Sequence, residues 1–186
     1  IHEYLDEFKR DVFDRYDCFT LAEAPLVWPK QALKYIDEEQ GQIDMMIQFQ
    51  CVAADCFLTD YYPTKFNLRK MKKAFSSWQQ GLKGKAWNSL YIENHDHPRI
   101  ISRYGSEKFW KESGKMLAVS YLFQKGTPFI YQGQEIGMVN INLPNPDDYQ
   151  DVQTINNTRT LRMMGMSKKK ADARISRTAR GNARTP

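Results

Sequence analysis

The sequence predicts an α/β fold, and three observations support this prediction. Short runs rich in β-forming residues alternate with longer amphipathic stretches along the chain. The stretches between the runs are long enough for helical crossovers, which connect parallel strands. The composition, with 41% hydrophobic and 26% charged residues, is typical of a globular protein, and 186 residues can bury a core.

The N-terminal part of the chain predicts two helices and two strands. In residues 2–16, apolar side chains recur at helical spacing, at Leu5, Phe8, Val12 and Tyr16. Residues 18–22 are β-prone, and the prolines that follow indicate a loop. A weaker helical pattern covers residues 30–39, and the apolar run 45–51 predicts the second strand.

The remaining elements continue the alternation. Residues 66–82 are a clear amphipathic helix, with five large apolar side chains in register. The other predicted segments are a strand at 88–93, a helix at 107–124, a strand at 127–132, and helices at 149–163 and 168–178. The order is one helix followed by four strand–helix units. These units fit a small open sheet, and they fit half of a (β/α)8 barrel equally well.

The charge of the chain lies mainly at one end. The net charge is +5, but residues 162–186 carry eight basic residues and one acidic residue, so the rest is nearly neutral. This basic segment lacks interleaved aromatic residues, so we favour a solvated helix face over nucleic-acid binding.

No run approaches the roughly 18 apolar residues of a membrane span. Three cysteines without zinc-ligand spacing and an acidic, amphipathic start favour a cytoplasmic protein.

Two carboxylates follow predicted strands and are candidate catalytic residues. Glu23 comes after the strand at 18–22, and Asp96 comes shortly after the strand at 88–93. In parallel α/β folds the carboxyl ends of strands carry the active site. A pair of carboxylates that flanks one bond is what glycoside hydrolysis requires. The alternative is that both residues cap helices.

The segment around Asp96 is dense in polar side chains, reading Asn94-His95-Asp96-His97-Pro98-Arg99. Neighbouring histidine and aspartate can bind a metal, but no third ligand lies nearby in the sequence. Donors and acceptors together suit a polyol better, so we expect no metal and no cofactor. Pro98 also indicates a helix start, with Asp96 or His97 as its cap.

Four segments carry a family resemblance, in order along nearly the whole chain: 19–25, 87–99, 126–138 and 179–186. Together they resemble glycoside hydrolase family 13, the α-amylase superfamily. Within that family they are most similar to the branch of α-glucosidases, oligo-1,6-glucosidases and dextran glucosidases. Two departures occur. Ala22 stands where the family usually has Gly, and Gly181 stands where it has Asp.

The resemblance implies roles for individual residues. Glu23 would be the general acid/base and Asp96 the carboxylate that stabilises the transition state. His95 would bond sugar hydroxyls, and Arg180 or Arg184 would do the same, because the change at Gly181 leaves the register open. The substrate would be a short α-linked gluco-oligosaccharide, cleaved with retention.

The resemblance also implies that the chain is the second half of a (β/α)8 TIM barrel, strands five to eight. The family's nucleophilic aspartate, its first four strands, its inserted domain and its C-terminal β-domain find no match within residues 1–186. We therefore expect the chain alone to be inactive, and to need the missing half-barrel or self-association. The alternative is a non-catalytic half-barrel that binds sugar or serves in assembly.

Overall fold

The computed structural model describes residues 1–57, 59–141, 143 and 148–179. The chain forms two compact units. Unit 1 consists of Ile1–Cys51, Leu68–Leu90 and Leu122–Phe129. Unit 2 consists of the remaining segments, Val52–Asn67, Tyr91–Tyr121 and Ile130–Pro186.

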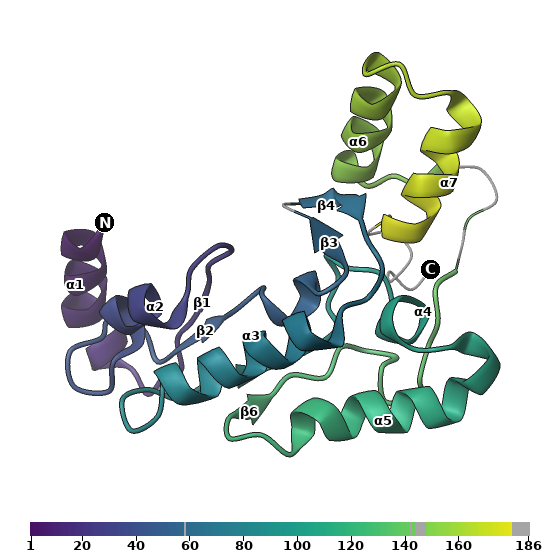
Figure 1. Ribbon diagram of the computed structural model, residues 1–186. Helices are drawn as coiled ribbons and strands as arrows, with labels where there is room; N and C mark the ends of the chain where they lie inside the picture. The colour runs from purple at the N-terminus through teal and green to yellow at the C-terminus, as the bar shows by residue number, and fades with distance from the viewer. Residues whose placement is uncertain (58, 142, 144–147, 180–186) are drawn as a thin grey trace. The chain divides into compact units, whose positions relative to one another are not determined.

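Unit 1 contains the parallel strands and the helices between them (Figure 1). Its elements are α1 (His2–Asp11), a 3-10 turn η1 (Phe13–Arg15), β1 (Leu21–Glu23), α2 (Pro29–Ile36), β2 (Met45–Ile47), α3 (Leu68–Gly81), β5 (Ser89–Leu90) and β6 (Thr127–Pro128).

The strands of unit 1 lie side by side in the order β1–β2–β5–β6. β1 pairs with β2 and β5 pairs with β6, both in parallel. Ser89 Oγ donates a 2.6 Å hydrogen bond to the carbonyl of Met46, which holds β5 beside β2. The order of these strands in space equals their order along the chain. Strand order without reversal is typical of a barrel, whereas doubly wound sheets reverse it.

The strands are shorter than the sequence predicts. The run 45–51 forms a strand only over Met45–Ile47, and the run 88–93 only over Ser89–Leu90. The first predicted helix also ends early, at Asp11, because the backbone at Val12 turns to φ −126°. Residues beyond each short strand are therefore left to form loops.

The core of unit 1 gathers on α2, α3 and β2. Its fully buried members are Ala32, Ile36, Met46, Trp78, Leu82 and Ala86. The apolar face predicted for 66–82 is confirmed, because Met71 and Trp78 are buried on α3. The indole Nε1 of Trp78 donates a 3.0 Å bond to Gln50 Oε1, which satisfies the polar atom of this large buried ring.

Gly126 sits against the backbone of β5, where a side chain does not fit. Its φ is +149°, and a Cβ would lie 2.4 Å from the carbonyl oxygen of Asn88. That carbonyl accepts the hydrogen bond from Thr127 N that starts the β5–β6 pairing. Gly126 therefore permits the close approach of the two strands.

We expect Gly126→Ala to lower the free energy of unfolding by about 3 kcal/mol, because it adds a backbone clash to an unfavourable φ. Gly84→Ala is the matched control, since Gly84 has φ +67° and open space around it. Its cost should be only the left-handed strain, about 1 kcal/mol. Denaturant unfolding of both variants, followed by circular dichroism, measures the difference. Equal losses would contradict the role given to the Asn88 carbonyl.

Unit 2 combines a hairpin with helices (Figure 1). Its elements are β3 (Cys56–Phe57), β4 (Thr59–Pro63), α4 (Ile100–Tyr104), a 3-10 turn η3 (Glu107–Phe109), α5 (Trp110–Leu122), α6 (Val152–Met163) and α7 (Lys168–Thr178), preceded by a 3-10 turn η2 (Cys51–Ala53) at the boundary. The antiparallel β3–β4 hairpin is not predicted by the sequence, whereas α4 begins two residues after Pro98, close to the helix start that this proline indicates.

Helices α6 and α7 confirm the predicted helices near the C-terminus, and they share a small core. Its buried members are Tyr149, Leu161, Ala171, Ile175 and Ala179. The Oδ2 atom of Asp151 accepts hydrogen bonds from the backbone and hydroxyl of Thr154, at 2.7 and 2.6 Å, and so caps α6. Among the helices that the structure describes, none is long and apolar enough to cross a membrane.

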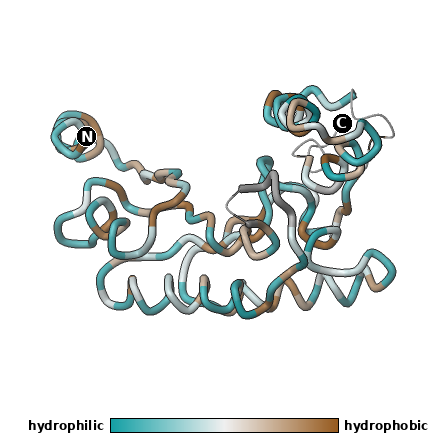
Figure 2. Tube along the Cα trace, turned by 45° about the horizontal axis from the view of Figure 1, so that its top comes forward, coloured by the Kyte–Doolittle hydropathy of each residue, from teal (hydrophilic) through white to brown (hydrophobic). Residues whose placement is uncertain are grey.

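The N-terminal helix α1 is amphipathic, as Figure 2 shows near the label N, yet it buries no residue. Tyr4, Phe8 and Val12 are all exposed. Its contacts to the rest of unit 1 include the His2 ring, which stacks on Tyr35 at 4.5 Å. Of the side chains on the predicted apolar face, Phe8, Val12 and Tyr16 are exposed and Leu5 is half-buried.

Candidate functional site

Glu23 is the last residue of β1, paired opposite Ile47 of β2, and its side chain is exposed. The capping alternative for Glu23 is wrong, since α2 has Trp28 at its N-cap and no side-chain cap. Leu26, three residues on, has a left-handed backbone, φ +70°, and an exposed side chain. A β1 carboxylate at a strand end, followed by a strained loop, is a geometry common at functional sites.

The start of β1 is fastened to the start of β2 by Thr20 and Asp44. Asp44 Oδ2 accepts bonds from the backbone and hydroxyl of Thr20 at 2.7 and 2.6 Å. The backbone of Asp44 donates in return to the Thr20 hydroxyl at 2.9 Å. Three bonds between two residues fix the register of the strands, and the register brings Glu23 to the carboxyl edge.

His95 and Asp96 lie together in a turn of unit 2. The side chain of Asn94 accepts a 3.0 Å bond from the backbone of Asp96, which shapes the turn. His95 Nε2 is 3.7 Å from Asp96 Oδ1, and His95 is the more exposed of the two. Both polar side chains are therefore accessible to a ligand, whereas His97 is buried.

A buried ion pair brackets this turn. Arg99 Nη1 lies 2.6 Å from Glu93 Oε1, and each side chain is only 1% exposed. The second oxygen of Glu93, Oε2, accepts a 2.8 Å bond from the backbone of Ile100, the first residue of α4. Glu93 therefore pairs with Arg99 and also accepts the hydrogen bond of the first amide of α4.

The surroundings of Glu93 act on its ionisation in opposite directions. Burial raises the pKa of the Glu93 carboxyl above its ordinary value. The hydrogen bond from Ile100 and the bond and charge of Arg99 oppose part of that effect. The charge of Glu135 adds a smaller upward contribution, and the net shift of the Glu93 pKa is upward.

The loop between residues 131 and 140 holds Arg99 from the other side. Arg99 Nη1 also donates to the carbonyl of Gln132 at 2.8 Å, and its guanidinium lies 4.9 Å from the centre of the Tyr131 ring. The side chain of Asn140 accepts a 2.8 Å bond from the Arg99 backbone. The Asp96 turn is thereby joined to the segment that follows β6.

Two expectations about the polar segment are corrected by these contacts. Arg99 is not available to a polyol, because it is buried and bonded to Glu93 and Gln132. Asp96 and His97 do not cap α4, whose N-cap is Arg99 and whose first amide is satisfied by Glu93. Sequence reasoning missed Glu93 as a site-building residue. The available signal was a carboxylate directly after a buried apolar run, with an arginine six residues later.

Arg180 and Arg184 are also predicted site residues, but both lie outside the described residues. Within the part of the chain that the structure describes, no group of three or more His, Cys, Asp or Glu side chains could hold a metal ion. Glu23 belongs to unit 1, and His95 and Asp96 belong to unit 2.

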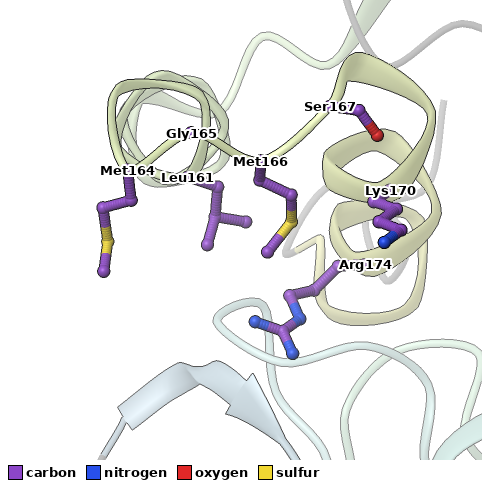
Figure 3. A pocket seen from close by; sticks show the side chains of 7 residues that line it. All are labelled: Leu161, Met164, Gly165, Met166, Ser167, Lys170 and Arg174. Atoms are coloured by element: carbon purple, nitrogen blue, oxygen red, sulfur yellow. The ribbon is translucent and has the colours of Figure 1, made fainter.

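A cavity of about 430 Å³ opens at the turn between α6 and α7 (Figure 3). Its lining residues are Leu161, Met164, Gly165, Met166, Ser167, Lys170 and Arg174. Neither Glu23 nor Asp96 lines it. The cavity is therefore separate from the residues that the sequence selects as catalytic.

Comparison with known proteins agrees with the family resemblance of the sequence. The family model for the alpha amylase catalytic domain matches residues 1–186. The oligo-1,6-glucosidase of Parageobacillus thermoglucosidasius is 39% identical over 189 residues, covering 100% of this chain and 34% of that protein. The oligo-1,6-glucosidase of Halalkalibacterium halodurans is 42% identical over 188 residues, with the same coverage.

Solved structures give the same result. The trehalose-6-phosphate hydrolase of Bacillus licheniformis superposes with a TM-score of 0.89 and 37% identity, over 100% of this chain and 34% of that one. The isomaltulose synthase of Erwinia rhapontici gives 0.92 and 28% identity, with the same coverage. The chain spans about a third of the length of these relatives. Since the family model covers all 186 residues, the chain belongs to the alpha-amylase family and carries part of its TIM-barrel catalytic domain.

Proposed function

We propose that these residues form strands five to eight, with their helices, of the barrel of a retaining α-glucosidase that hydrolyses short gluco-oligosaccharides. The observation that carries the proposal is the position of two carboxylates. Glu23 ends β1, and Asp96 follows β5, in a row of strands that keeps chain order. The names of the relatives, oligo-1,6-glucosidase and alpha-glucosidase, support the substrate class.

In this proposal Glu23 gives its proton to the glycosidic oxygen as the bond from that oxygen to the anomeric carbon breaks. A nucleophilic carboxylate from the rest of the barrel forms the glycosyl-enzyme ester. Glu23 then takes a proton from the water that hydrolyses the ester. Asp96, as a carboxylate, stabilises the positive charge of the oxocarbenium-like transition state.

Binding groups complete the site. His95 is exposed beside Asp96 and offers a ring nitrogen to sugar hydroxyls. Arg180 or Arg184 would supply a further donor. The proposal requires neither a metal nor another cofactor, and its partner is the remainder of the barrel.

The open face of α1 supports the need for a covering partner. Tyr4 and Phe8 are exposed on a helix that buries no residue, and Val12 is exposed directly after it. The two strands at the ends of the described row are exposed too, as at Leu21 in β1 and both residues of β6. Apolar surface of this kind is stabilised by burial against further barrel elements.

The test uses a grafted barrel, in which these 186 residues replace the matching stretch of the Parageobacillus thermoglucosidasius oligo-1,6-glucosidase. We expect the grafted barrel to release p-nitrophenol from p-nitrophenyl α-glucoside, and the 186-residue chain alone to release none above buffer. A folded but inactive graft would contradict the proposal. Sugar binding without hydrolysis by that graft would favour the non-catalytic binding module instead.

A further inference from the structure

The turn that carries Asp96 lacks regular secondary structure to hold it. β5 ends at Leu90 and α4 begins at Ile100, so the nine residues between them belong to no helix or strand. Glu93 and Arg99 stand three residues before and three residues after Asp96. Their 2.6 Å ion pair closes the turn at its base.

The closed turn is also tied to a second segment. Arg99 reaches the Gln132 carbonyl through the same Nη1 atom that binds Glu93. The Arg99 backbone is held by Asn140, and its guanidinium rests on Tyr131. The pair therefore fixes the Asp96 turn relative to the segment after β6.

We propose that Glu93 and Arg99 are positioning residues for the Asp96 carboxylate. This inference rests on the proposed function of Asp96. Neither side chain touches substrate, because both are buried. They act by holding the backbone of the turn, so that the carboxylate stays where positive charge develops.

The choice of a charged pair fits positioning better than packing alone. Two apolar side chains of similar volume would fill the same space without directional bonds. The planar guanidinium bonds its partners at fixed angles, and Glu93 uses both oxygens, one for Arg99 and one for the Ile100 amide. A misplacement of about 1 Å in an active site can cost about a hundredfold in rate.

The test substitutes Arg99→Lys and Glu93→Gln in the grafted barrel. Lysine keeps the positive charge of Arg99 but lacks the planar guanidinium with its several N–H donors. Glutamine keeps the shape of Glu93 but lacks its negative charge. We expect kcat per folded molecule to fall about ten- to a hundredfold, with a smaller change in KM, because the Asp96 charge is used in the transition state. The folded fraction is determined by circular dichroism. Asn140→Ala, which leaves both charges in place, is the milder variant, and a several-fold loss of kcat is expected there.

Arg103→Lys is the matched control. Arg103 is another arginine of unit 2, with a side chain that is 6% exposed, bonded through Nε to Asp55 at 3.0 Å and through Nη2 to the Val52 carbonyl at 2.8 Å. It lies over the Tyr104 ring as Arg99 lies over Tyr131. The side-chain bonds of Arg103 go to Asp55, Val52 and Cys56 and not to the Asp96 turn, and its backbone bond to the Arg99 carbonyl does not depend on the side chain. Arg103→Lys should therefore lower stability and leave kcat per folded molecule unchanged.

The outcomes separate this inference from the proposed function. Loss of kcat in the Arg99, Glu93 and Asn140 variants, with normal kcat in Arg103→Lys, supports positioning. Equal kcat losses at Arg99 and Arg103, or unchanged kcat at Arg99, overturn it. Asp96→Asn is measured alongside. If Asp96→Asn keeps its kcat, the proposed role of Asp96 is wrong. If Asp96→Asn loses its kcat while the Arg99 variant keeps its own, only the positioning role is refuted.

Discussion

Glu23→Gln in the grafted barrel is expected to lower kcat for isomaltose hydrolysis by about 10²–10⁴-fold, the range for loss of a general acid/base. Glutamine has the shape of glutamate but can neither give a proton to the leaving oxygen nor take one from water. Glu39→Gln is the matched control, because Glu39 is an exposed glutamate in the loop after α2 of the same unit. Its turnover should equal that of the unchanged graft.

Two substrates with different leaving groups test the acid role of Glu23 more directly. p-Nitrophenolate departs with little help from an acid, whereas a sugar alkoxide needs its proton. Glu23→Gln should therefore slow the formation of the glycosyl-enzyme less with p-nitrophenyl α-glucoside than with isomaltose. Single-turnover rates on both substrates measure it. Equal losses on both, or no loss on either, would contradict Glu23 as the acid.

Arg99→Met is expected to lower the free energy of unfolding by about 3–5 kcal/mol, the usual cost of leaving one charge of a buried pair without its partner. The loss should depend on pH. Burial raises the pKa of Glu93 in the folded protein above its ordinary value of 4.5. A carboxyl of this kind contributes stability below about pH 4.5, and that contribution is lost as pH rises through the folded pKa.

Without Arg99 the upward shift in the pKa of Glu93 grows, so the total decline in stability is larger and extends to higher pH. We expect Arg99→Met to lose more stability between about pH 5 and about pH 8 than the unchanged protein does. The double variant Glu93→Met with Arg99→Met removes both charges, so it should recover most of the loss and be flat in this range. Urea unfolding at both pH values measures all three. A pH-independent loss in the single variant would mean that Glu93 is not the group left uncompensated.

The strand–helix order could be predicted from the sequence because each unit carries its own local pattern. α3 is the clearest case, with Met71 and Trp78 repeating at helical spacing and buried as expected. Strand lengths could not be predicted in the same way. The apolar run 45–51 continues past β2, but Gln48 and Cys51 bond each other at 2.9 Å in a buried turn instead of extending the ladder.

Features that depend on distant partners were missed. Pro98 indicates a helix start, but the local pattern predicts neither the five-residue length of α4 nor the bond of its first amide to Glu93, seven positions earlier. The β3–β4 hairpin begins at Cys56 in a stretch without the regular alternation that marks a strand. The candidate residues Glu23, His95 and Asp96 came from strand ends and family resemblance. Burial of Arg99 depends on the segment 131–140, which no local pattern around residue 99 reveals.

The Glu93–Arg99 pair also constrains how this part of the protein can evolve. Substitution of either residue alone leaves the other as an unpaired buried charge, which lowers the stability of the fold. Organisms that depend on this protein would then lose fitness, because a less stable protein is present in smaller amounts. Both residues must therefore change together, or a neighbouring change must first admit water. No single nucleotide change can substitute both residues at once. The pair is therefore expected to change far more slowly in evolution than exposed residues such as His95.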